Sequence, residues 1–153
     1  MLDSGLAPNV CDVTGQLPKH SIRESKAQRR GVKYVTANGG DIPNIGETTV
    51  VHRDELQGDF NFVFQHAPGV HAIILSVRKL VNKGCRVSFR KGGGTIRYSD
   101  GRKLKFVERM GVFFVPLNIL DPDVLKDSVE MVVQHSDRPD EPAQGFVRQV
   151  RSP

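Results

Sequence analysis

The sequence predicts an all-β domain with one short helix near its C-terminal part. Short runs of alternating apolar and polar residues recur along the chain, and 15 glycines and 9 prolines separate them. No apolar run has the length of about 20 residues that a membrane-spanning helix needs. The length of 153 residues fits about one domain. We therefore predict a β domain over 1–120, a short helix over 121–134 and a disordered tail or linker over 135–153.

The first half of this domain predicts a hairpin followed by longer strands. A weakly alternating strand over 33–37 ends at Asn38-Gly39, a dipeptide typical of hairpin turns. A returning strand follows over 42–51. Phe60, Phe62 and Phe64 then alternate with other residues, which indicates one buried aromatic face. The next strand, over 70–75, is almost continuously apolar.

The second half begins with the short helix and continues as strands. Ser76 is placed to cap a helix that has Val77, Leu80 and Val81 on one face and ends at Gly84. Glycine-rich turns then separate four short strands, which we predict over 85–89, 95–98, 103–107 and 111–117.

Charge is unevenly distributed along the chain. The net charge is +5, acids outnumber bases over 121–153, and basic residues concentrate over 19–33 and 78–91. A basic segment can bind nucleic acid, or it can be an ordinary solvated surface. Because aromatic residues are not interleaved with the basic ones, we expect no specific nucleic-acid site.

Cysteine and histidine usage points away from metal chemistry. Cys11 and Cys85 are the two cysteines, and the lack of a signal-like leader or a glycosylation sequon fits an intracellular, cytoplasmic protein. A Cys11–Cys85 disulfide is the alternative to free thiols. The five histidines lack metal-like spacing with the cysteines, so we expect no metal, no cofactor and no membrane partner. The segment 91–95 looks like a phosphate loop, but it leads into a strand, so we expect a hairpin turn.

The start of the chain, Leu2-Asp3-Ser4-Gly5, carries the most specific chemistry. An apolar residue followed by Asp-Ser-Gly can present a carboxylate on a tight turn at the end of a strand. Two such carboxylates, held about 3 Å apart, share one proton, so one acts as a base and the other as an acid. The tripeptide alone also fits an exposed turn near a terminus, and its meaning depends on the motifs that follow.

Those motifs come in a definite order. After Asp-Ser-Gly the chain has Lys33-Tyr34-Val35-Thr36-Ala37-Asn38-Gly39-Gly40-Asp41-Ile42-Pro43, then Phe62-Val63-Phe64-Gln65, Ile74-Leu75-Ser76-Val77-Arg78-Lys79-Leu80, Gly84-Cys85-Arg86-Val87-Ser88-Phe89 and Gly111-Val112-Phe113-Phe114-Val115. Together they resemble the retropepsin-like aspartic protease domain of retrotransposon polyproteins, especially the Copia-type ones. The resemblance covers residues 2 to about 119.

The resemblance implies a small closed β-barrel that acts as a homodimeric endopeptidase on a peptide or polyprotein substrate through an activated water. Each chain would supply one catalytic carboxylate. The implied roles are Asp3 as the catalytic residue, Ser4 and Gly5 as the active-site loop, Asn38, Gly39 and Gly40 as the flap, and Ile74, Leu75 and Ser76 as support for the loop.

Two departures from the family pattern bear on activity. Leu6 stands where the family usually has Ala or Ser, and a larger side chain there can overpack the loop. Only Met1 and Leu2 precede Asp3, whereas the family has a strand before the catalytic loop. We therefore expect an N-terminally truncated or decayed copy. The alternative to an active protease is a non-catalytic relic that dimerises or binds peptide or nucleic acid weakly.

Overall fold

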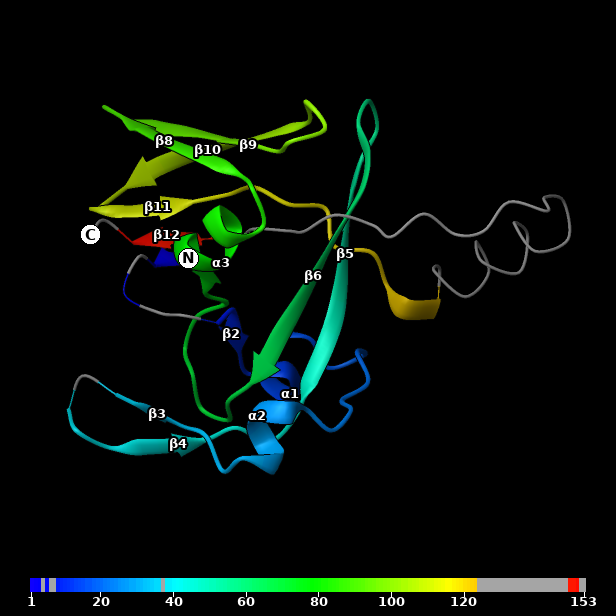
Figure 1. Cartoon of the computed structure of the whole chain (residues 1–153), viewed down its shortest axis with the longest axis vertical. Coiled ribbons are helices and arrows are strands. Elements are labelled where there is room, and N and C mark those ends of the chain that lie inside the picture. The colour runs from blue at the N-terminus through cyan, green and yellow to red at the C-terminus, as the bar shows by residue number, and fades with distance from the viewer. Residues whose placement is uncertain (4, 6–7, 37, 124–148, 152–153) are drawn as a thin grey trace, which may run out of the picture.

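Alternating apolar and polar residues form strands along most of the chain. The computed structural model describes residues 1–3, 5, 8–36, 38–123 and 149–151. Over these residues the fold is mostly β (Figure 1), which confirms the predicted class. The helices described are short: α1 (Val13–Gln16), α2 (Lys26–Arg29) and α3 (Val77–Asn82).

The longest elements form one hairpin. β5 (Glu47–Asp54) and β6 (Gly58–His66) pair antiparallel along their whole length. Because side chains alternate across a strand, Phe60, Phe62 and Phe64 share one face. Each of the three is at most 1% exposed, which confirms the predicted buried aromatic face.

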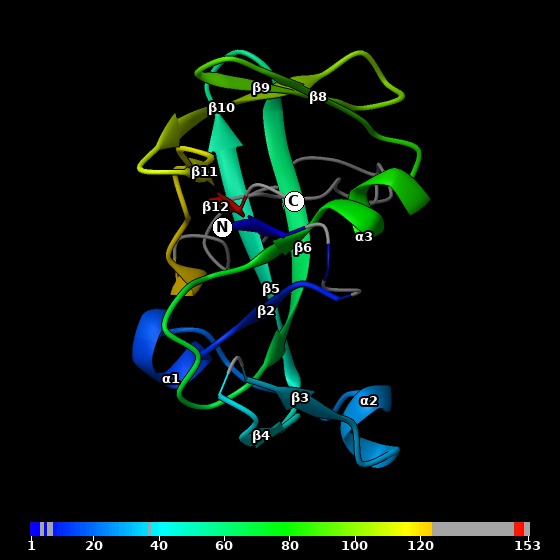
Figure 2. The same ribbon diagram turned by 90° about the vertical axis from the view of Figure 1, so that its left-hand side faces the viewer.

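The second half of the chain forms an antiparallel sheet of five strands in the order β12-β11-β10-β9-β8. Its strands are β8 (Arg86–Arg90), β9 (Gly93–Arg97), β10 (Lys103–Arg109), β11 (Val112–Phe114) and β12 (Gln149–Arg151). Glycines with positive φ, Gly92 at 84° and Gly101 at 91°, lie at the turns, so the segment 91–95 is a hairpin turn as expected. Figure 2 shows strands β8, β9 and β10 at one end of the molecule, with the β5–β6 hairpin running up to them.

A single core cluster draws residues from the five-stranded sheet and from the hairpin. The ring centroids of Phe106 and Phe113 lie 5.6 Å apart, and Phe89 lies 5.3 and 5.2 Å from them. Phe89 therefore faces the core as predicted, yet it stays 42% exposed because β8 is the edge strand of the sheet. The guanidinium of Arg102 lies 4.1 Å from the centroid of Phe60 and covers this ring.

The remaining strands make short pairings, two of which form separate two-stranded sheets. β1 (Leu2–Asp3) pairs with β7 (Leu75–Ser76), β2 (Val10–Cys11) adds to β6, and β3 (Lys33–Val35) pairs with β4 (Asp41–Pro43). The strands that the structure describes do not close into a barrel, because these two- and three-residue pairings do not bridge the larger sheets.

Helix caps explain the three helices. The Ser76 hydroxyl accepts a hydrogen bond from Lys79 N at 3.1 Å and begins α3, as the sequence predicts. Asp12 and Ser25 cap α1 and α2 in the same way. The sequence pattern does not predict these two helices, because four residues are too few to show an apolar period.

The structure describes only part of the predicted C-terminal region. Beyond residue 123 the predicted helix over 121–134 lies outside the described residues, and so does most of the predicted tail. Within the predicted tail, Gln149–Arg151 forms β12 against β11. Cys11 and Cys85 are buried free thiols, so the disulfide alternative is wrong. In the part of the chain that the structure describes, no helix is long and apolar enough to cross a membrane.

Candidate functional site

The predicted catalytic residue lies at the end of β1. This strand runs parallel to β7, with Leu2 opposite Leu75 and Asp3 opposite Ser76. The amide of Leu75 donates a hydrogen bond to the carbonyl of Met1. The backbone of Asp3 is thus fixed against a strand whose first residue, Leu75, is fully buried.

The chain returns to the same strand on its other side. Val10 N donates to Ile74 O at 3.0 Å, and Ile74 N donates to Val10 O at 2.8 Å. Val10 also lies opposite Gln65 in the pairing of β2 with β6. The loop between Asp3 and Val10 is therefore anchored at both ends by the segment 73–76.

Asn9 strengthens this anchor, and the sequence analysis did not identify it. Its side chain is 2% exposed. The amide nitrogen Nδ2 donates to Val63 O at 3.1 Å, and Oδ1 accepts from Ser76 N at 2.9 Å. Its carbonyl accepts from Gln65 N at 2.8 Å. Asn9 therefore ties the end of the loop to both β6 and β7, a role that no local pattern in the sequence could reveal.

The structure thus brings Asp3 and the segment Ile74-Leu75-Ser76 together, as the resemblance implies. Gly5 is an exposed bend. Ser4, Leu6 and the side chain of Asp3 lie outside the part that the structure describes.

The predicted flap is a hairpin of β3 and β4. Tyr34 lies opposite Ile42 in its register. At the tip Thr36 N donates to Gly40 O at 2.8 Å, and Gly39 N donates to Thr36 O at 2.9 Å. Gly39 has a φ of 84°, which favours glycine. The tip residues Asn38, Gly39 and Gly40 are exposed, and Figure 1 shows the hairpin projecting from the molecule below β1.

A buried amide fixes the base of this hairpin. Asn44 is 5% exposed, and its Nδ2 donates to the Tyr34 hydroxyl at 2.9 Å and to Gln65 Oε1 at 2.8 Å. Its Oδ1 accepts from Ser25 Oγ at 2.9 Å and from Gly46 N at 3.0 Å. Burial raises the pKa of Tyr34, so the phenol stays protonated. The hairpin is therefore held to β6 and to the start of α2.

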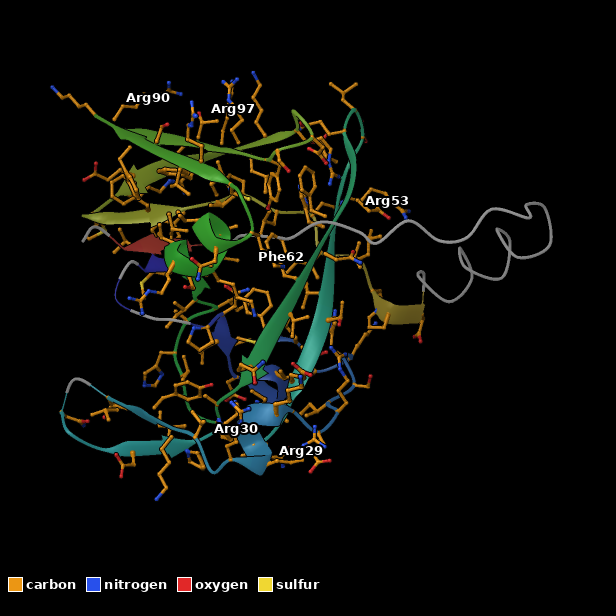
Figure 3. The ribbon with its side chains drawn as sticks, viewed as in Figure 1. Arg29, Arg30, Arg53, Phe62, Arg90 and Arg97 are labelled. Carbon is orange, nitrogen blue, oxygen red and sulfur yellow. The ribbon has the colours of Figure 1, made fainter. Side chains whose placement is uncertain are left out.

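A pocket of about 400 Å³ lies between Pro8, α2 and the base of the hairpin, with Lys26, Arg30 and Tyr34 among its lining residues. Arg30 lies beside α2, near the base of β3 and β4 (Figure 3). Among the described residues neither Lys26 nor Arg30 forms an ion pair. The pocket therefore combines apolar walls with two cations that form no ion pair in this part of the chain, and with Glu47, which pairs with Arg23, and Gln65.

A more open hollow of about 450 Å³ also includes Pro8 in its lining, together with Lys79, Asn82 and Lys83. Burial, and then the charge of Lys83, lower the pKa of Lys79. Lysine and arginine side chains from both basic segments of the sequence thus line the two hollows that share Pro8, and Glu47 is the acid among the lining residues.

Among the described residues, no group of histidine, cysteine or acidic side chains is arranged to hold a metal ion. No protein-family model, no curated protein and no solved structure matches this chain significantly.

Proposed function

We propose that this chain is a retropepsin-like aspartic endopeptidase of a retroelement polyprotein, in which two copies of the chain each contribute Asp3 to one site. One observation carries this proposal. The segment 73–76 is bound on one side by β1 and on the other by Val10, and this arrangement fixes a loop that begins with Asp-Ser-Gly at the end of a strand.

The anchored loop suits the chemistry of a carboxylate pair. Two Asp3 carboxyl groups at short distance would share one proton. The ionised carboxylate takes a proton from a water molecule, which attacks the carbonyl carbon of the peptide bond, and the protonated carboxyl donates its proton to the substrate. Small displacements of such groups cost large factors in rate, so a loop fixed at both ends supports the assignment.

The surroundings of the loop support a peptide substrate. The β3–β4 hairpin, with Asn38, Gly39 and Gly40 at its tip, would cover the bound peptide, as a flap does. Val35 on this hairpin is 75% exposed and offers apolar surface to a substrate side chain. The two hollows that share Pro8 would receive side chains next to the cleaved bond, and the lysine and arginine side chains that line them favour acidic ones.

The test is proteolysis by the purified chain of an unfolded protein or a peptide library at about pH 5, where a carboxylate pair can hold one proton. Asp3→Asn is expected to abolish cleavage because the neutral amide cannot take a proton from water. The matched control is Glu55→Gln, which changes an exposed carboxylate in the β5–β6 turn and is expected to cleave at the wild-type rate.

Circular dichroism of both variants separates loss of chemistry from loss of fold. Cleavage that survives in Asp3→Asn would contradict the catalytic assignment. A folded wild-type chain that cleaves no peptide at any pH would favour the non-catalytic relic.

A further inference from the structure

One face of the five-stranded sheet carries cations that are in register across three strands. Arg86 on β8 lies opposite Arg97 on β9, and Arg97 lies opposite Lys103 on β10. All three side chains are exposed. Strands in a sheet lie about 4.8 Å apart, so this row places three positive charges along roughly 10 Å.

More cations extend this row along the strands. Alternate residues of a strand share a face, so Lys105 follows Lys103 on β10 and Arg90 lies two pairs beyond Arg86 on β8. We call Arg86, Arg90, Arg97, Lys103 and Lys105 the cationic face. The other side of the same strands is buried and includes Ile96, Leu104 and Phe106, so the cationic face is the outward one.

The cationic face has no acidic residue on its own three strands, and Asp54 of β5 lines a hollow together with Lys103 and Lys105. Its remaining positions on β8–β10 are Ser88, Thr95, Gly93, Val107 and Arg109, none of which is acidic. Arg90 Nη2 lies 3.4 Å from Thr95 Oγ1, and within the described residues none of the five cations forms an ion pair. Figure 3 shows Arg90 and Arg97 pointing away from the body of the molecule.

Stability does not account for this arrangement. Like charges directly opposite each other on neighbouring strands destabilise a sheet, and Arg86, Arg97 and Lys103 form two such pairs in one row. Contact with an anionic partner would replace this destabilising repulsion by a favourable interaction. The register therefore points to a ligand that carries several negative charges at close spacing.

We propose that the cationic face binds the phosphate backbone of nucleic acid without sequence preference. Phosphates follow each other along a strand at a spacing that several neighbouring Lys and Arg side chains can match at once. No aromatic residue lies among the outward positions of β8, β9 and β10, so base recognition is not expected. An anionic membrane is a poorer fit because the apolar residues on this side are few, Val107 on β10 and the half-buried Val112 and Phe114 on β11, whereas interfacial binding needs an apolar surface to bury.

This inference does not depend on the protease proposal. The cationic face belongs to β8, β9 and β10 at one end of the molecule, whereas the β3–β4 hairpin projects at the other end (Figure 1). Loss of catalysis in Asp3→Asn would therefore leave nucleic-acid binding intact, and loss of the cationic face would leave the Asp3 loop intact.

The experiment is a fluorescence-anisotropy titration of labelled single-stranded RNA, single-stranded DNA and duplex DNA, each in two unrelated sequences. The full chain is compared at about 50 and 150 mM salt, a range in which phosphate-driven binding weakens steeply. The variant Arg86→Gln/Arg97→Gln/Lys103→Gln tests the face. The control Arg29→Gln/Lys33→Gln/Arg78→Gln removes as many exposed cations from other surfaces.

We expect the wild-type chain to bind all sequences of one type equally. The face variant should bind at least tenfold more weakly, and its slope of log affinity against log salt should be smaller by about 2 to 3. The control should stay within twofold of wild type. A second face variant, Arg90→Gln/Lys105→Gln, should also weaken binding if the triple variant is unstable, as thermal unfolding will show.

Three results would overturn the proposal. Equal weakening by the face variant and the control would mean that only net charge matters. Tight binding of one sequence at 150 mM salt would mean base recognition elsewhere on the molecule. Binding to vesicles rich in anionic lipid that exceeds binding to nucleic acid would assign the face to membranes.

Discussion

At the scale of single residues, Asn9 is the side chain on which the candidate site most depends. It satisfies one buried amide on β7 and one buried carbonyl on β6, and an unsatisfied buried polar group costs about 1–3 kcal/mol. The loop that begins at Asp3 therefore owes its position to a residue six places further along the chain.

We predict that Asn9→Ala lowers the free energy of unfolding by about 3 kcal/mol, because Ser76 N and Val63 O lose their partner. The same change is expected to reduce the rate of proteolysis by a larger factor than the loss of folded chain explains, because the end of the loop is released. Urea unfolding measures the first effect. Asn82→Ala is the control at an exposed position, where a change within about 0.5 kcal/mol is expected, and an equally small change in Asn9→Ala would contradict the assigned role.

His52 makes the stability of the fold depend on pH. Its Nδ1 accepts a hydrogen bond from Asn118 N at 2.8 Å, the residue is 6% exposed, and its ring stacks on Phe60 with centroids 5.6 Å apart. Burial lowers the pKa of His52 below its usual value of 6.5, so folding favours the neutral ring.

Because the folded pKa is the lower one, the contribution of His52 is complete above about pH 6.5 and is lost as the pH falls through the folded pKa. We predict that the free energy of unfolding decreases from about pH 7.5 to pH 5, and that His52→Gln reduces this decrease. Urea unfolding at several pH values measures it. His71→Gln, at an exposed histidine, should keep the wild-type dependence, and an unchanged dependence in His52→Gln would contradict the prediction.

At the scale of elements, alternation, turn residues and the cap of α3 were predictable from the sequence, whereas the four-residue helices α1 and α2 were not. The alternation of Phe60, Phe62 and Phe64, the cap at Ser76 and the turn at Gly101 each reflect neighbours in sequence, and each appears where expected. β1 and β2 are different, because each has two residues and exists through pairing with distant segments. No local pattern encodes such strands.

The residues of the candidate site also fall into two groups, those that the sequence points to and those that depend on distant partners. The Asp-Ser-Gly motif and the segment 74–76 were identified from a resemblance, and their backbone pairing was not derivable from either segment alone. Asn9 and Asn44 were missed because a buried asparagine is recognised by its distant partners, and the surrounding sequence looks like an ordinary turn.

Gly94 sets how closely β9 packs against its neighbours. It lies in β9 between Phe89 on β8 and Phe106 on β10, and a Cβ added at Gly94 would collide with the Ser88 carbonyl and the Phe106 ring. We predict that Gly94→Ala lowers the free energy of unfolding by about 3 kcal/mol through overpacking, measured by urea unfolding.

The control for Gly94→Ala is Gly101→Asn. Gly101 has open space around its Cα and a φ of 91°, a region that asparagine tolerates better than other residues. A loss of less than about 1 kcal/mol is expected there. Equal losses in both variants would show that β9 can move apart from its neighbours.

At the scale of the whole molecule, the proposed chemistry requires two copies. One chain supplies one Asp3, so we predict that cleavage per molecule falls on dilution, in step with dimer dissociation measured by sedimentation. An excess of Asp3→Asn chains should also inhibit wild type, because mixed dimers have a single catalytic carboxylate. Full activity in a demonstrated monomer would contradict this prediction.

The central position of the segment 73–76 has a consequence for folding. About seventy residues separate it from the N-terminal strands that bind its two sides, so closing these contacts carries the entropic cost of a long loop. During synthesis on the ribosome, β1 has no partner in this segment until residue 76 has emerged, whereas Val10 can already pair with β6. A fluctuation that extracts this one segment frees the Asp3 end of the loop, while the Val10 end stays paired with β6. The amides of Ile74 and Leu75, which bond to Val10 and Met1, should then exchange with solvent in a single cooperative event, and the loop opens from its Asp3 end.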